Sequence, residues 1–136
     1  MRDKMPCDDK LKERGCCLAS ICNLCGNHEE STFHLFFLCS YSTRIWIWLA
    51  SILQTSIQIT SAEEVWNLCN RGWLAHCQLT VKAAIIFTIN AIWYSRNVVR
   101  FKQKKNHPLE VCYFHHHFGS FYFCWKLKAS RKYFNA

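Results

Sequence analysis

The residues of this chain whose types and spacing could carry chemistry lie near its N-terminus. Cys22 and Cys25 are followed by His34 and Cys39, in the spacing C-x2-C-x8-H-x4-C. Three thiolates and one imidazole make a tetrahedral donor set of the kind that holds a structural zinc ion, and four protein ligands leave no position open for a catalytic water. The pattern therefore predicts a Zn2+ site that stabilises the fold.

The second pair of candidate ligands poses a geometric problem. His34 lies in a short apolar segment that is expected to be helical, with Ser31 or Thr32 as its N-cap. Five positions correspond to a rotation of about 140° around a regular α-helix. His34 and Cys39 can therefore face one ion only if the helix ends, tightens or kinks, and we expect a break around residues 39–41.

Two other interpretations of these residues remain open. His28 follows Cys25 by three positions and could replace His34 as the nitrogen ligand, although it would have to reach back across a short turn. Alternatively, the cysteines are ordinary buried side chains, because unpaired Cys is among the most buried residue types. The combination of a Cys-x2-Cys pair with a His/Cys pair in one short segment favours a metal site.

Several stretches of the sequence resemble a known family. They are DKLKERG at residues 9–15, CNLCG at 22–26, ESTFHLFFLC at 30–39 with Trp46, and IWYSRNVVRF at 92–101. The first stretches and Trp46 resemble the zinc-binding domain that lies C-terminal to the polymerase in plant LINE-type (non-LTR) retrotransposon reverse transcriptases. The last resembles the helix that follows this domain. The resemblance covers about residues 7–105. It implies an accessory domain of a reverse transcriptase polypeptide that binds Zn2+ and contacts RNA or DNA.

The sequence departs from the family pattern in three places. Cys7 stands where the family usually has a threonine that opens the first helix, although Asp8 could cap this helix instead. Ser40 stands where a proline commonly follows the last ligand, so one device that would stop the helix is missing. Residues 108–136 match no known pattern.

Hydrophobic periodicity predicts a mainly α fold: a small helical domain organised by the Cys3His zinc knuckle, a long C-terminal helix and a poorly defined tail. A capping box at residues 61–64 predicts the start of one helix, and Gly72 its end. The expected units are a zinc-binding domain, a helical extension and a basic, aromatic-rich tail. They span residues 7–55, 56–107 and 108–136, respectively.

The longest predicted helix covers about residues 79–105 and is apolar nearly all round between residues 83 and 94. Lys82 and Arg96 limit this apolar stretch to thirteen residues, fewer than the roughly 20 that a membrane span requires. Asn90 also lies in its middle. We therefore expect a buried core helix and no membrane partner.

Positive charge is concentrated in the last third of the chain. The net charge is +8, and residues 96–136 hold nine Lys and Arg residues but one acidic residue. Arg96, Arg100 and Lys104 are four positions apart and share a helix face, with Lys102 and Lys105 beside them. Such a stripe could follow a phosphate backbone. Alternatively, these are solvated cations that favour a helix C-terminus.

The ten cysteines would suggest disulfides in a secreted protein. The charged N-terminus has no apolar segment typical of a signal peptide, so we expect an intracellular protein, nuclear or cytoplasmic, with reduced cysteines. The tail holds enough donors for a second metal site, but their spacing does not repeat that of the first. These donors are Cys112, His115, His116, His117 and Cys124.

The sequence offers little support for an enzyme. A polymerase site needs clustered aspartates that hold two metal ions, and the only adjacent pair is Asp8-Asp9 on a short charged segment. After residue 64, Glu110 is the only acidic residue. We expect a non-catalytic module that binds nucleic acid. The alternative is a structural or protein-interaction module from a degenerate retroelement fragment.

Overall fold

The computed structural model describes residues 6–56, 58–104, 107–108 and 110. No β-strand occurs in these ranges. The mainly α fold with a long C-terminal helix, predicted from the sequence, is confirmed. In chain order the elements are α1 (Asp8–Glu13), the short π-helix η1 (His34–Leu38), α2 (Ser40–Ile52), α3 (Ala62–Asn70) and α4 (Ala75–Lys102).

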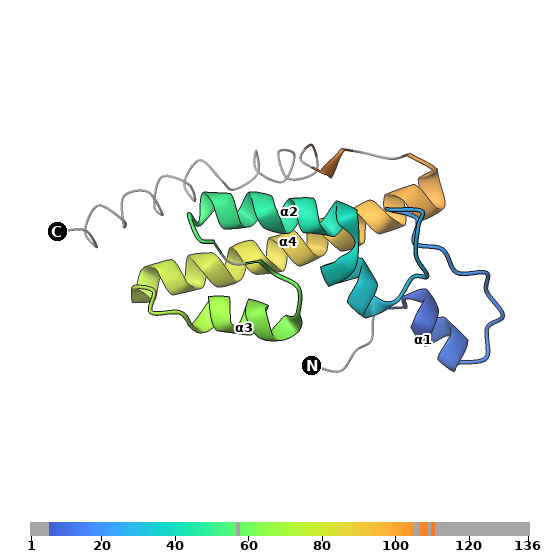
Figure 1. The fold of residues 1–136 in the computed structure, drawn as a ribbon, viewed down its shortest axis with the longest axis horizontal. Helices are drawn as coiled ribbons and strands as arrows, with labels where there is room; N and C mark the ends of the chain where they lie inside the picture. The colour runs from blue at the N-terminus through green and yellow to red at the C-terminus, as the bar shows by residue number, and fades with distance from the viewer. Residues whose placement is uncertain (1–5, 57, 105–106, 109, 111–136) are drawn as a thin grey trace.

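The long helix α4 lies in the middle of the structure. Helices α2 and α3 pack against it and run antiparallel to it, while α1 and η1 lie toward its C-terminal end (Figure 1). One apolar cluster joins η1 to the three longer helices. Its most deeply buried members include Leu35, Ile45, Trp46, Leu68, Val81 and Ile92.

Helix α4 also has an exposed apolar face. It carries Leu79, Ile86, Phe87, Tyr94 and Phe101, each at least half exposed. The expected core helix is present, since Val81, Ala84, Ile85 and Ile92 lie in the core. The apolar face is exposed because the helices packed on α4 cover only part of its circumference. By length and composition the stretch Cys77–Lys102 could cross a membrane, and 39% of its most apolar window is buried in the protein. The expectation of no membrane partner stays a prediction.

The ends of α3 and α4 follow from local sequence. Ser61 Oγ accepts a hydrogen bond from the Glu64 amide, and the Glu64 carboxylate accepts one from the Ser61 amide, which confirms the predicted capping box. Helix α3 ends at Asn70, just before Gly72. Helix α4 begins at Ala75 and ends at Lys102, whereas the sequence predicted residues 79–105. It ends at Lys102 because the next residue, Gln103, adopts a left-handed conformation with φ 51°.

Helix α1 is held to the segment that precedes η1. The Asp9 carboxylate accepts hydrogen bonds from the Thr32 amide and hydroxyl, at 3.2 and 3.5 Å. Cys7 is the N-cap residue but makes no capping hydrogen bond. Asp8 does not cap the helix either: it is buried in the first turn, and its carboxylate contacts Arg100. The start of α1 is therefore fixed by tertiary contacts.

Candidate metal centre

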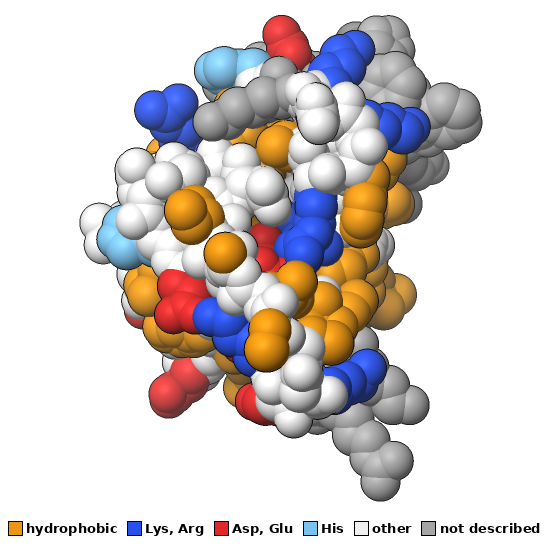
Figure 2. Space-filling view, turned by 90° about the vertical axis from the view of Figure 1, so that its right-hand side faces the viewer, with side chains coloured by type: hydrophobic (Ala, Val, Ile, Leu, Met, Phe, Trp, Pro, Cys, Tyr) orange, Lys and Arg blue, Asp and Glu red, His pale blue; other side chains and the backbone are white. Residues whose placement is uncertain are grey.

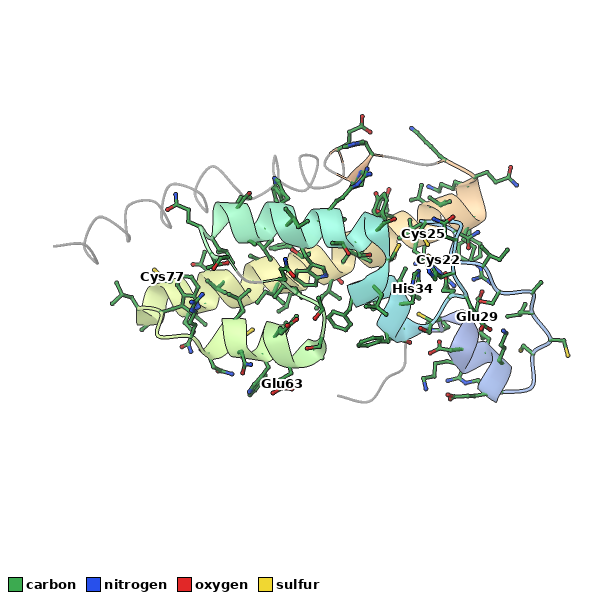
Figure 3. All side chains as sticks on the ribbon, in the orientation of Figure 1. Cys22, Cys25, Glu29, His34, Glu63 and Cys77 are labelled. Atoms are coloured by element: carbon green, nitrogen blue, oxygen red, sulfur yellow. The ribbon has the colours of Figure 1, made fainter. Side chains whose placement is uncertain are left out.

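The four candidate ligands come together in one cluster. Figure 3 shows Cys22, Cys25 and His34 near the C-terminal half of α4. Their donor atoms all lie within 4.8 Å of one another. Cys22 Sγ lies 3.8 Å from Cys39 Sγ, and Cys25 Sγ lies 3.3 Å from His34 Nε2. A tetrahedral zinc ion with ordinary bond lengths separates two sulfurs by about 3.8 Å and a sulfur from a nitrogen by about 3.5 Å. Both distances are therefore close to those around one tetrahedral ion.

The turn that carries the first ligand pair is closed by main-chain hydrogen bonds. The Gly26 amide donates to Cys22 O at 2.7 Å, and the Cys22 amide donates to His28 O at 2.8 Å. Gly26 has φ 73°, a left-handed conformation that glycine adopts without steric cost. This reversal brings the Cys25 sulfur back toward Cys22.

The second ligand pair is positioned by the π-helix η1. The Cys39 amide donates to His34 O at 2.7 Å, which is the i to i+5 hydrogen bond of a π-turn. This bond brings the two residues onto the same side. The predicted break is present, because Cys39 has extended backbone with ψ 129°. The helix, however, widens before it ends. Ser31 caps it, since its Oγ accepts from the His34 amide at 3.0 Å.

Helix α2 supports this turn through two side-chain hydrogen bonds. The Ser42 hydroxyl donates to Leu35 O at 2.5 Å, and the Trp46 indole donates to Phe36 O at 2.7 Å. Both interactions are buried, so two carbonyls in the π-helix have partners. Sequence reasoning missed this role of Ser42 and noted Trp46 only as part of the family resemblance.

The pKa shifts of the candidate ligands differ in direction. The hydrogen bond with Cys39, together with burial, raises the pKa of Cys22, and the same contact lowers the pKa of Cys39. Burial and the neighbouring His28 lower the pKa of His34, which favours the neutral imidazole that a metal needs. Because metals bind thiolate, occupation of the site would release the Cys22 proton.

His28 and Cys7 are not part of this donor set. The exposed His28 ring lies beside the His34 ring, with centroids 5.2 Å apart, but His34 supplies the nitrogen that lies among the sulfurs. Burial raises the pKa of Cys7 to about 11, so this fully buried side chain stays a thiol at neutral pH. The arrangement favours Cys22, Cys25, His34 and Cys39 as ligands, and the ligation itself stays a prediction.

The predicted basic stripe is not one solvent-facing surface. Arg96 is 2% exposed, and its guanidinium binds the carboxylate of Glu30, which is fully buried. Arg100 Nη1 lies 2.5 Å from Asp8 Oδ1. Arg96 is therefore buried, whereas the Arg100 side chain is 23% exposed. The periodicity of a helix does not show what packs on its basic face, and the nucleic-acid contacts of these residues stay a prediction.

The remaining cations differ in position. Lys102 and Lys104 are exposed beyond the arginines. Lys105 lies outside the described residues, as do the donors between residues 112 and 124 that could form a second site. Figure 2 looks at the end of the molecule where α4 terminates. Lys and Arg side chains lie there at separate places among apolar and neutral ones.

Comparison with known proteins finds a match for the N-terminal part of the chain. Residues 1–46 match the family described as zinc-binding in reverse transcriptase. The match includes all four donor residues and ends at Trp46 in α2. No curated protein and no solved structure has significant similarity to the chain, and an origin in a plant LINE element stays a prediction. The first 46 residues are therefore similar to the reverse-transcriptase zinc-binding family.

Proposed function

We propose that this chain is a non-catalytic, intracellular Zn2+-binding module that helps a reverse transcriptase polypeptide to bind RNA or DNA. The observation that carries the proposal is the close cluster of donor atoms from Cys22, Cys25, His34 and Cys39 inside the stretch that matches the family. Three soft thiolates and one imidazole suit zinc, whereas magnesium and calcium prefer oxygen ligands.

In this proposal zinc is a structural ion. It would join the Cys22 turn to η1 and complete the packing of both against α2 and α4. The buried carboxylates of the described residues have cationic partners: Asp8 contacts Arg100, and Glu30 contacts Arg96. Because two-metal polymerase and nuclease sites need carboxylates that are free to bind ions, this arrangement supports a non-catalytic role.

The proposed nucleic-acid contacts come from exposed cations near the C-terminal end of α4. Lys102 and Lys104 are exposed there, whereas Arg96 and Arg100 already bind carboxylates. Lysine contacts to phosphate release counterions and so weaken as salt increases. We therefore propose these two lysines, with Lys105 as the next basic residue, as phosphate contacts that do not depend on base sequence.

Titration of labelled single-stranded RNA with the full zinc-loaded chain, over a series of salt concentrations, tests this proposal. The variant Lys102→Gln/Lys104→Gln should bind two unrelated RNA sequences more weakly and by a similar factor. It should also reduce the slope of log affinity against log salt by about 1 to 2. Lys82→Gln, an exposed cation elsewhere on α4, is the control and should bind as the parent does. Unchanged affinity and slope in the double variant would reject the phosphate contacts.

A second function, protein interaction, is favoured by the exposed apolar face of α4. Leu79, Ile86 and Phe87 are 72%, 59% and 60% exposed, which is unusual for side chains of this size on one helix. If the zinc-loaded parent chain shows no salt-dependent binding to RNA or DNA, this protein-interaction function takes precedence.

A further inference from the structure

An arginine from α4 holds the segment that joins the two pairs of metal ligands. Glu30 lies between Cys25 and His34, and its side chain is fully buried. Arg96 Nε donates to both carboxylate oxygens of Glu30 at 3.1 Å, and Nη2 donates to Oε1 at 2.5 Å. The two residues are 66 positions apart. A bidentate pair of this kind restricts orientation as well as distance.

The guanidinium is itself fixed on α4. It lies over the Trp93 ring, 5.1 Å from the centroid, and its Nη1 donates to Asn97 Oδ1 at 3.0 Å. Burial alone would lower the pKa of Arg96, but the hydrogen bonds and charge of Glu30 raise it overall. Arg96 is therefore a charged, pre-oriented anchor on a long helix.

The position of Glu30 affects both ligand pairs. Its amide donates to Ser20 Oγ at 3.1 Å, and Ser20 lies two residues before Cys22. The next residue, Ser31, caps the η1 segment through the His34 amide. A displacement of Glu30 would therefore shift two parts of the site at once. These are the residues that lead into Cys22 and the start of η1.

A second ion pair, between Asp8 and Arg100, lies beside the pair of Glu30 and Arg96. Asp8 Oδ1 lies 2.5 Å from Arg100 Nη1 and 3.6 Å from Arg96 Nη2. Two carboxylates and two guanidiniums thus lie together, with Asp8, Glu30 and Arg96 almost fully buried. Removal of one member would leave a buried charge without its partner, which is strongly unfavourable.

We infer that Arg96 is a positioning residue of the metal site, and that the metal-binding unit includes α4 as well as the stretch that matches the family. The inference rests on the metal occupancy in the proposed function but not on nucleic-acid binding. It brings together residues on both sides of the domain boundary that the sequence suggested at residue 55.

Cobalt substitution in the full chain provides the test, because the visible absorption of Co2+ reports ligand geometry directly. Arg96→Gln should alter the shape and intensity of the Co2+ absorption band. It should also lower Zn2+ affinity, measured by competition with a chromogenic chelator, by about 10- to 100-fold. Lys82→Gln removes an exposed positive charge from the same helix and should leave the spectrum and the affinity unchanged.

Two further variants keep the test decisive if Arg96→Gln does not fold. Arg96→Lys keeps the charge but loses the bidentate geometry, and Glu30→Gln/Arg96→Gln removes both charges. Both should fold and still show an altered Co2+ band. A folded Arg96 variant with the parental spectrum and Zn2+ affinity would reduce the pair to a purely stabilising contact and overturn the inference. A parent chain that binds neither metal would overturn this inference and the proposed zinc site together.

Discussion

The indole Nε1 of Trp46 donates a hydrogen bond to the main-chain oxygen of Phe36 across 2.7 Å, and both residues are buried. Trp46 belongs to α2, while Phe36 belongs to the π-helix between two of the metal ligands. A buried carbonyl without a donor is costly, so this contact stabilises the widened turn. Packing of α2 is therefore linked to the geometry of the metal site.

Replacement of Trp46 by phenylalanine should test this link. Trp46→Phe keeps an aromatic ring but leaves Phe36 O without its donor, which should lower the free energy of unfolding by about 1 to 3 kcal/mol. Chemical denaturation of the zinc-loaded protein measures the change. Trp66→Phe is the matched control, because Trp66 is 69% exposed. Equal stability of the two variants would contradict the role assigned to Trp46.

Replacement of a candidate cysteine ligand should reduce zinc content and folding far more than replacement of a surface cysteine. Cys25→Ser or Cys39→Ser should lose zinc and unfold the N-terminal part, because structural zinc supplies an apparent ~10 to 16 kcal/mol of folding free energy in small peptides. Metal analysis and circular dichroism report the two effects. Cys16→Ser, at an exposed position outside the donor set, should retain one zinc per chain. Full zinc content and helicity in Cys39→Ser would show that Cys39 is not a ligand.

The two neighbouring histidines allow a direct comparison of alternative ligands. His34→Gln should abolish stoichiometric zinc binding, whereas His28→Gln should keep it, because His34 Nε2 lies among the sulfurs and His28 is exposed. Mass spectrometry under native conditions gives the stoichiometry. The reverse result would assign the nitrogen ligand to His28.

Acidification should release the metal ion. The pKa of His34 is lowered in the folded protein by burial and by His28. The unfolded chain therefore takes up this proton more readily, and the contribution to stability falls as the pH drops through about 6.5. Protons also compete with zinc for the thiolates. Zinc release followed with a chromogenic indicator should increase below this pH, and release that is constant between pH 8 and 5 would contradict the expectation.

The left-handed residue that ends α4 offers a stabilising substitution. Gln103 has φ 51°, a conformation that costs a residue with a side chain roughly 1 kcal/mol relative to glycine. Gln103→Gly should therefore raise the unfolding temperature. Gln78→Gly, inside the same helix, should lower it because glycine disfavours a helix interior by about 1 kcal/mol. Thermal unfolding compares the two, and a change of the same sign would reject the argument.

Features that depend on neighbours in sequence were predictable. The ligand spacing, the capping box at Ser61 and the break at Cys39 all involve residues a few positions apart. The widening of η1 was not predictable, because it is supported by Ser42 and Trp46 on the next helix. The ion pairs on the basic face of α4 were not predictable either, because they are formed with residues far away in the sequence.

Arg96 and Arg100 are four positions apart, so helical spacing places them on one face of α4. The spacing contains no information about the residues that bind them. Glu30 and Asp8 lie 66 and 92 positions away along the chain. The net charge of the last third therefore overstated the charge available to nucleic acid, since two of its cations are neutralised by acidic residues from the first 30 positions.

The π-turn also bears on how the ligand motif can vary among related sequences. A π-helical turn contains one residue more than the α-helical turn it replaces. Deletion of the exposed Leu38 would place the histidine and the last cysteine four positions apart, and an ordinary α-helical turn would then bring them to the same side. We therefore expect that the winding of one helical turn can absorb a single-residue insertion or deletion in this segment, so that related sequences can differ in this spacing and keep the four donors together.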